Sequence, residues 1–332
     1  MKKMGLIQLF RRNRKLLWAG FLALILIFVI TFPLYGGPYN VTVLTYVLLY
    51  VVLAVSWAMF SGTTGYMSLA PAAFVGLGIY SMAILQRQLP FPVIIVVGGL
   101  VSFAFALLIG LVTLRLRGIY FAIFTFGLVI FLSELIQYLE TTIRGAHGWA
   151  IIPMSYTMLL YTALGLAVVT VLAIYFLRRS RYGLAMLSIG GNEEAAAHMG
   201  INTTMVKVLG FAISSMFMGI AGVLLAPELI YINTNIAFST IYSFMPILMA
   251  VFGGMGTLYG PVVGAVVFAY LETMIRNEFP RYFLPSFGIT LVVVILFLPT
   301  GIAGLMPVLR ERLGRLRAKL WKGGQAEQHA NT

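Results

Sequence analysis

The stretch VTVLTYVLLYVVLAVSWAMF, residues 41–60, contains no charged residue. A helix needs roughly 20 apolar residues to cross the hydrocarbon core of a bilayer, so this stretch alone predicts a transmembrane helix. Similar stretches recur along the chain at 16–34, 66–85, 91–114, 118–139, 156–177, 206–226, 241–253, 257–275 and 284–305. The sequence therefore predicts an all-α, polytopic membrane protein with about ten transmembrane helices.

The composition supports a single transmembrane domain covering residues 1–332. Hydrophobic residues make up 61% of the chain and charged residues only 9%, whereas soluble domains carry roughly 25% charged residues. The net charge of +13 does not indicate nucleic-acid binding, because the basic residues form short clusters beside apolar stretches rather than one stripe with aromatics. There is no cysteine and no aspartate, so we expect no disulfide, no metal site and no cofactor held by this chain.

The basic clusters also predict the topology. Positively charged residues concentrate in cytoplasmic loops, which places both termini in the cytoplasm, as a basic tail at 1–15 and an amphipathic tail at 306–332. It also places a turn at Arg115–Arg117 and a polar segment at 178–207 on the cytoplasmic side. The lysines and arginines that fall outside these regions are Arg87, Arg144, Arg276 and Arg281.

Two predicted spans are interrupted. Residues 61–78 read SGTTGYMSLAPAAFVGLG, and residues 253–264 read GGMGTLYGPVVG. Irregular backbone at membrane depth requires protein or a water-filled cavity to satisfy it, and such segments often build transport sites. Close helix packing or a simple kink is an equally good interpretation. The candidate path residues are Gly62, Gly65, Pro71, Gly76, Gly253, Gly254, Gly256 and Pro261. Residues 241–275 fit either two crossings or one re-entrant hairpin.

The chain lacks the means to use ATP directly. No lysine follows a glycine, which excludes the phosphate-binding loop G-x-x-x-x-G-K-[ST]. We therefore expect no catalytic site, and energy must come from an ion gradient or from a partner. Glu134 is the candidate for an ion-coupled carrier, although it lies only roughly 8 Å from the outer end of the helix predicted at 118–139. A receptor or scaffold without transport activity is a third interpretation.

A polar insert favours a partner. Residues 178–202 read RRSRYGLAMLSIGGNEEAAAHMGIN. Asn192 is a good N-cap, Glu193 and Glu194 suit the first helical turn, and Gly200 suits a left-handed C-cap. These residues predict a helix of about two turns, too short to be stable alone. We expect its small alanines to face a groove on a partner protein.

These stretches resemble a known family. The motifs S-x-x-G-x-A at 180–185 and N-E-E-A-A-A-x-M-G-I-N at 192–202 resemble the coupling segment of permeases in branched-chain amino-acid ABC importers. Residues 61–80, 114–127 (LRLRGIYFAIFTFG) and 252–265 (FGGMGTLYGPVVGA) are similar to that family too, the last two to its M-type subunit. The resemblance assigns coupling to an ATPase to Gly183, Asn192, Glu193, Glu194, Ala195, Ala196 and Gly200.

The resemblance also implies an assembly in the bacterial inner membrane. Its parts would be a second related permease, two cytoplasmic ATPase subunits that hold ATP and Mg²⁺, and a periplasmic or lipid-anchored binding protein. Two departures stand out: Ala70–Pro71 replaces the usual Gly-His, and Ile189–Gly190 replaces the usual Ile-Arg. Importers of urea and short amides share these motifs, so the motifs do not identify the solute.

Overall fold

The computed structural model describes residues 26–145 and 147–278, with isolated positions between 285 and 301. Among these residues helices dominate, and the one sheet consists of two strands of two residues each. The elements are η1 Phe32–Leu34, α2 Pro38–Thr64, α3 Pro71–Leu85, α4 Phe91–Thr113, α5 Ile119–Arg144, β1 Trp149–Ala150, α6 Tyr156–Arg179, α7 Arg181–Gly191, α8 Glu193–His198, α9 Thr203–Leu225, η2 Ala226–Glu228, β2 Tyr231–Ile232, α10 Thr234–Ala237, α11 Ile241–Gly253 and α12 Gly260–Glu278.

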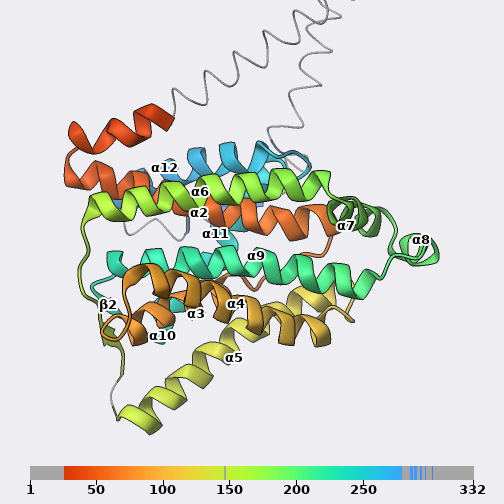
Figure 1. Ribbon diagram of the computed structural model, residues 1–332, viewed down its shortest axis with the longest axis horizontal. Helices are drawn as coiled ribbons and strands as arrows, with labels where there is room; N and C mark the ends of the chain where they lie inside the picture. The colour runs from red at the N-terminus through yellow and green to blue at the C-terminus, as the bar shows by residue number, and fades with distance from the viewer. Residues whose placement is uncertain are drawn as a thin grey trace, which may run out of the picture.

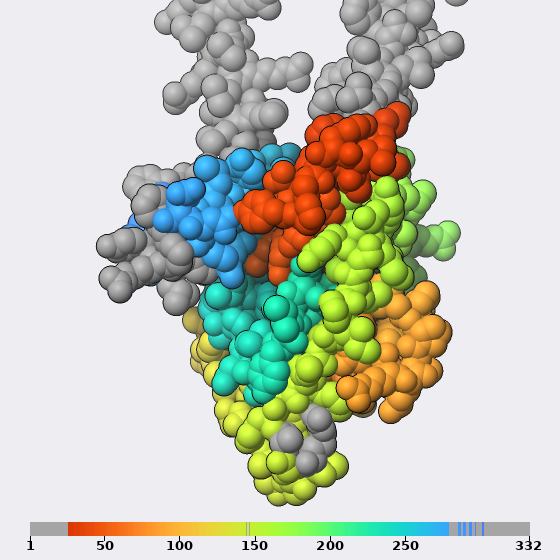
Figure 2. Space-filling model, turned by 90° about the vertical axis from the view of Figure 1, so that its left-hand side faces the viewer, coloured from red at the N-terminus to blue at the C-terminus, as the bar shows by residue number. Residues whose placement is uncertain are grey.

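Helices α2 and α9 form the centre of the bundle. In each of them, 78% of a membrane-length window is buried, against 28% in α5. Figure 1 shows α2, α6 and α9 lying nearly parallel while α5 runs obliquely to them, with α7 and α8 at one end of the bundle and β2 at the other. Helices α3 and α4 pack on α9, and α6 and α12 pack on α2. Figure 2, seen from the β2 end, shows α12 in blue against the red start of α2.

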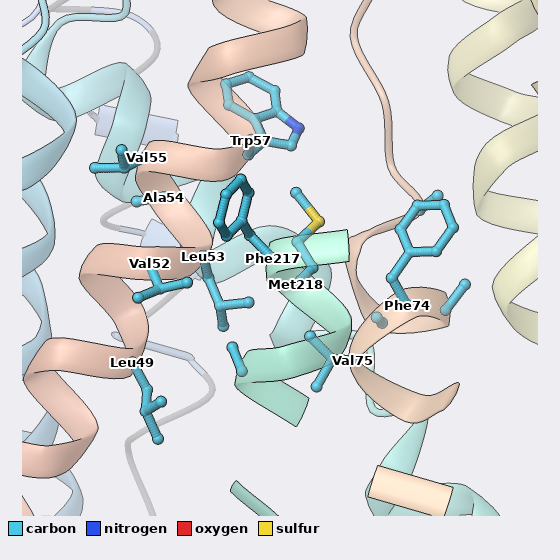
Figure 3. Packing of buried hydrophobic residues seen from close by; sticks show 14 of the residues in the cluster. Leu49, Val52, Leu53, Ala54, Val55, Trp57, Phe74, Val75, Phe217 and Met218 are labelled. Carbon is cyan, nitrogen blue, oxygen red and sulfur yellow. The ribbon is translucent and has the colours of Figure 1, made fainter. Parts of the chain in front are cut away.

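The buried core is built mainly by α2, α3 and α9. Figure 3 shows Leu53 and Trp57 of α2 near Phe217 and Met218 of α9, and all four side chains are buried. In lipid, burying apolar side chains adds no hydrophobic driving force between helices, so association depends on close packing. Dense contact between these helices is therefore the main stabilising interaction.

Glycines allow the closest approaches in this core. A Cβ added to Gly222 of α9 would lie 2.2 Å from the carbonyl oxygen of Val75 in α3. A Cβ added to Gly78 would lie 2.0 Å from the carbonyl oxygen of Gly219. Only a residue without a side chain lets two helix backbones approach this closely.

The predicted spans are confirmed in part. Among the described residues, six helical stretches are long and apolar enough to cross a membrane: Pro38–Thr64, Phe91–Thr113, Ile119–Ile143, Tyr156–Arg179, Thr203–Glu228 and Thr234–Gly253. The chain is thus a multi-pass, all-α protein, while a count of ten is not confirmed. Spans 16–34 and 284–305 lie largely outside the described residues.

The span predicted at 66–85 was wrong in its bounds. The helix expected at 66–85 begins only at Pro71, so at 1.5 Å per residue it is roughly 22 Å long, short of a bilayer core. The preceding helix, α2, ends because Gly65 adopts a left-handed conformation (φ 74°). The interruption predicted at 61–78 is therefore real, and residues 65–70 are not helical.

The position of Glu134 also needs correction. Helix α5 continues to Arg144 and is capped by Gly145, five residues beyond the predicted end. Glu134 thus lies roughly 15 Å from that end of the helix rather than 8 Å. It is an exposed carboxylate well inside a membrane-length helix.

Replacing Gly222 by alanine should destabilise the bundle by about 1–3 kcal/mol, because the added methyl group overlaps the α3 backbone. Gly165→Ala in α6 is the matched control, because a Cβ there meets no atom within 4 Å. That control should be neutral or stabilising by up to about 1 kcal/mol. Thermal unfolding of the two variants in detergent measures the difference, and equal melting temperatures would contradict this account of the packing.

Candidate functional site

The polar insert folds into two short helices, α7 and α8, at one end of the bundle (Figure 1). The Ser180 side chain caps α7 by accepting a hydrogen bond from the Gly183 N–H at 3.2 Å. Helix α7 was not predicted from the sequence. A signal was present, since Ser180 is a good N-cap and the buried residues Gly183, Met186 and Ile189 recur every third position.

The short helix predicted at 193–199 is confirmed as α8. The Asn192 side chain accepts a hydrogen bond from the Ala195 N–H at 3.0 Å. At the other end, Gly200 has φ 84° and its N–H donates to Ala197, while the Ile201 N–H donates to Ala196. This pair of bonds is the Schellman pattern of helix termination.

The inner side of α8 is anchored by a buried charge. Lys207 is 3% exposed although it lies in the first turns of α9. Its Nζ donates to Glu193 Oε1 at 2.6 Å, to the Leu114 carbonyl at 3.0 Å and to the Tyr66 hydroxyl at 3.1 Å. The Tyr66 hydroxyl donates in turn to the Glu193 carboxylate. One ammonium group thus connects α8, α9, the end of α4 and the interrupted segment 65–70.

The electrostatics keep this cluster charged. Burial by itself raises the pKa of the Glu193 carboxyl, but the hydrogen bonds from Lys207 and Tyr66 outweigh it and lower that pKa below the usual range. Glu193 is therefore an ionised acceptor and Tyr66 a protonated donor at neutral pH. The sequence placed Lys207 at the end of the polar segment 178–207 and did not predict that its side chain is buried.

Only part of α8 is available to a partner. Ala196 is completely buried, so the expectation that its side chain faces a partner was wrong. Glu194, Ala195, Ala197, His198 and Met199 are exposed. The ion pair between Arg117 and Glu194 lies on this outer surface, with both side chains mostly exposed, and such pairs contribute little to stability.

Helix α7 lies directly against the end of α2. A Cβ added to Gly190 would lie 2.3 Å from the carbonyl oxygen of Thr63. Gly190 is the position where the family usually has arginine, and an arginine could not fit this contact. Gly183, a predicted coupling residue, is needed for the same reason, because a Cβ there would lie 2.1 Å from the Leu177 carbonyl.

The second interrupted segment reaches the same end of the molecule. Arg178 Nη2 donates to the Met255 carbonyl at 3.2 Å, and the side chain of Met255 faces Gly62, where an added Cβ would lie 3.2 Å from Met255 Cβ. The two interruptions, separated by about 190 residues in the sequence, therefore touch each other beside α7. Sequence reasoning treated them separately.

The first interruption is held by side chains from three other places. The Trp57 indole donates to the Ser68 carbonyl at 2.8 Å, and the Leu69 N–H donates to Thr125 Oγ1 at 3.0 Å. Ser243 Oγ donates to the Leu69 carbonyl at 2.9 Å. These bonds satisfy backbone groups that a continuous helix would have paired internally.

The candidate path residues separate into two groups. Those buried in this chain are Pro71, Gly76, Gly253, Gly254 and Pro261. Glycine at such a position allows close contact with a neighbouring element; for example, a Cβ added to Gly253 would lie 1.8 Å from the Gly260 carbonyl. Gly65 and Gly256 are exposed and Gly62 is partly exposed. That any of them borders a path stays a prediction. Helices α11 and α12 pack antiparallel through Gly253 and Gly264, which suits either two crossings or a re-entrant hairpin.

The opposite end of the molecule contains a cavity of about 420 Å³ between α3, α4 and α5, with Glu140 in its wall. The Glu140 carboxylate accepts a hydrogen bond from the Trp149 indole at 2.6 Å and is buried. Glu272 is also buried and pairs with Arg276 one helical turn later. Among the described residues, no group of three or more potential metal ligands occurs.

These features define a multi-pass membrane protein with two interrupted helices and a polar segment anchored beside them. Residues 39–298 match the family of the branched-chain amino acid transport system, permease component, and the chain belongs to that family. It is 27% identical to the high-affinity branched-chain amino acid transport system permease protein LivM of Salmonella typhimurium strain LT2, over 92% of this chain and 79% of that protein. LivM of Escherichia coli strain K12 is 26% identical over the same shares.

Another similarity covers a shorter part of the chain. The permease protein LivH of Salmonella typhimurium is 32% identical over 39% of this chain and 42% of that protein. No solved structure matches the chain. The chain is therefore a transport component, and the resemblance seen in its motifs is confirmed.

Removing the ammonium group of Lys207 should release α8 from the bundle. Lys207→Met should cost roughly 2 kcal/mol, because Glu193 loses a charged hydrogen bond in a mostly buried place. Thermal unfolding in detergent, and the rate of proteolysis between α8 and α9, measure this change. Arg117→Gln is the control and should leave both measurements unchanged. If Lys207→Met behaved like the control, the anchoring role would be wrong.

Proposed function

We propose that this chain is the M-type permease subunit of an ABC importer that carries branched-chain amino acids across the bacterial inner membrane. Family membership supports the transport role, and the similarity to two LivM proteins over most of the chain supports the solute class. A urea or short-amide importer, and an ion-driven carrier using Glu134, are less favoured because neither agrees with those relatives.

The observation that carries the proposal is the arrangement of α8. It is capped at both ends, anchored from behind by Lys207 and open on its outer face. A helix of two turns does not hold its shape in water alone, so its anchoring suits a surface that another protein pushes against. In our proposal, that protein is one of two cytoplasmic ATPase subunits, which hold the ATP and Mg²⁺.

Coupling then proceeds through contacts described above. Movement of α8 displaces Glu193 together with Lys207 and Tyr66, and Tyr66 belongs to the first interruption. Movement of α7 displaces the end of α2 through Gly190, and Arg178 connects the same region to the second interruption. Docking would thereby shift the equilibrium between two arrangements of the membrane domain. The interrupted segments around Gly62 and Gly256 would shape the path of the solute.

The proposed topology has about ten transmembrane helices, counting spans at both ends of the chain. Both termini and the α7–α8 end face the cytoplasm, since Arg115, Arg117, Arg179 and Arg181 gather at that end, as the positive-inside rule requires. The other partners are a second related permease and a periplasmic or lipid-anchored binding protein.

Placing arginine on the outer face of α8 tests the docking. Ala195→Arg should weaken ATPase binding roughly tenfold, the effect of about 1.4 kcal/mol, because a long charged side chain replaces a methyl group in the contact. Binding to the purified ATPase subunits and uptake by vesicles measure it. Ile230→Arg, at the opposite end and 88% exposed, is the control. Normal ATPase binding by Ala195→Arg would refute docking on α8.

Competition for uptake tests the solute class. In vesicles holding the complete assembly and supplied with ATP, unlabelled isoleucine and valine should suppress uptake of labelled leucine, whereas urea and acetamide at the same concentration should not. Suppression by urea alone would replace the proposed solute with a short amide. Accumulation of leucine without ATPases, under a proton gradient, would instead establish the ion-driven carrier.

A further inference from the structure

A small cavity lies where the first interruption leaves α2. Its volume is about 10 Å³, close to the space that one water molecule needs. Figure 3 shows three of the residues that line it, Trp57, Phe74 and Met218, on three different helices. The other lining residues are two aromatic residues and three serines, namely Phe60, Phe211, Ser61, Ser68 and Ser214. The wall therefore combines apolar side chains with three hydroxyl groups.

The protein encloses this cavity. Each of its lining residues is at most 4% exposed. The ring of Phe211 packs against the rings of Phe60 and Phe74, with centroids 5.2 and 5.3 Å apart. Neither a lipid chain nor a solute of amino-acid size fits such a space, so an occupant must be very small.

Two of the serine hydroxyls need an acceptor. Ser61 Oγ accepts a hydrogen bond from the Ser68 N–H at 3.3 Å, and Ser68 Oγ accepts one from the Ala70 N–H at 3.3 Å. No described residue accepts a hydrogen bond from either hydroxyl group. Leaving a buried hydroxyl proton without an acceptor is costly, and here two such protons lie beside the same cavity.

Other buried serines in the described part of the chain show the usual solution. Ser81 donates to the Leu77 carbonyl at 2.7 Å, and Ser215 donates to the Ala212 carbonyl at 2.7 Å. The hydroxyls of Ser56 and Thr113 also lack a partner, but neither residue lines this cavity. An unpaired hydroxyl alone is therefore weak evidence, and the coincidence of two of them with a cavity of this size is what carries the argument.

The count of donors and acceptors distinguishes water from a metal cation. A water molecule can accept from Ser61 and Ser68 and donate to Ser214 Oγ, because the Ser214 hydroxyl already donates its own proton to the Ser56 carbonyl at 2.6 Å. Three partners are typical of a buried water. A cation would use the oxygen lone pairs instead, leave both protons without an acceptor, and find no carboxylate in the wall.

We propose that one ordered water molecule is bound in this cavity and bridges α2, the first interruption and α9. It accepts hydrogen bonds from the hydroxyls of Ser61 and Ser68 and donates one to Ser214 Oγ. Irregular backbone at membrane depth is tolerated where protein or water satisfies its polar groups. The water supports the interruption from the side of α9, and this inference does not depend on which solute the protein carries.

A structure of the purified protein at a resolution that shows ordered water tests the site directly. We expect one density peak within hydrogen-bond distance of Ser61 Oγ, Ser68 Oγ and Ser214 Oγ. The peak should persist when choline replaces sodium and potassium in the buffer. A cavity without a peak would overturn the proposal, and so would a peak that disappears in choline, which would indicate a cation.

A double-mutant cycle tests whether the two hydroxyls share the water. Ser61→Ala and Ser68→Ala should each raise the unfolding equilibrium constant in detergent, because each removes one partner of the water. The rise in the double variant should be roughly threefold or more below the product of the single rises, since the second substitution removes a hydroxyl that has already lost its acceptor. The density peak should also disappear in the double variant.

Ser81→Ala is the matched control. Its hydroxyl is buried and bonded to a helix carbonyl, and it does not line the cavity. Combined with Ser61→Ala, it should give the product of the two single effects and leave the density peak in the native Ser61 background unchanged. Independent effects of Ser61→Ala and Ser68→Ala would mean that no water connects them. Coupling without a density peak would mean that the hydroxyls contact each other directly, and would also overturn the proposal.

Discussion

The structure depends on one constraint: backbone groups at membrane depth must find partners inside the protein. In a helix, the backbone N–H and C=O groups bond to each other. Residues 65–70 do not form a helix, so their backbone groups rely on the side chains of Trp57, Thr125 and Ser243. These side chains come from α2, α5 and α11. The interruption can therefore exist only once the bundle is assembled, and any change in the bundle alters the support of this segment.

The buried Lys207 extends the same constraint to the short helix α8. An ammonium group that is almost completely buried is tolerated only when its protons are all accepted, and here the acceptors lie on α8, on the end of α4 and in the first interruption. Displacing any one acceptor leaves a charge with too few partners. The short surface helix α8 is thus linked to the membrane helices by an ion pair and hydrogen bonds, and not only by its neighbours in the sequence.

Several features of the site could be predicted because they depend on neighbours in the sequence. The caps of α8, at Asn192 and Gly200, involve residues within a few positions of each other, and the prediction was confirmed. The prediction that Ala196 faces a partner was wrong because the position of α9 decides which side of this two-turn helix is buried. The span predicted at 118–139 ended five residues before α5 does, because the sequence alone did not show that the indole of Trp149 binds the Glu140 carboxylate and lets it be buried.

The sequence by itself determined that the chain spans a membrane many times, where two helices break and which segment forms a short helix capped at both ends, because apolar length, glycine and proline positions and caps act locally. Only the tertiary structure decided that the two interruptions meet beside α7, that Lys207 is an anchor, and that α5 leaves the Glu134 side chain exposed. Those facts depend on contacts between residues far apart in the chain, and such contacts are set by how whole helices pack rather than by any local pattern.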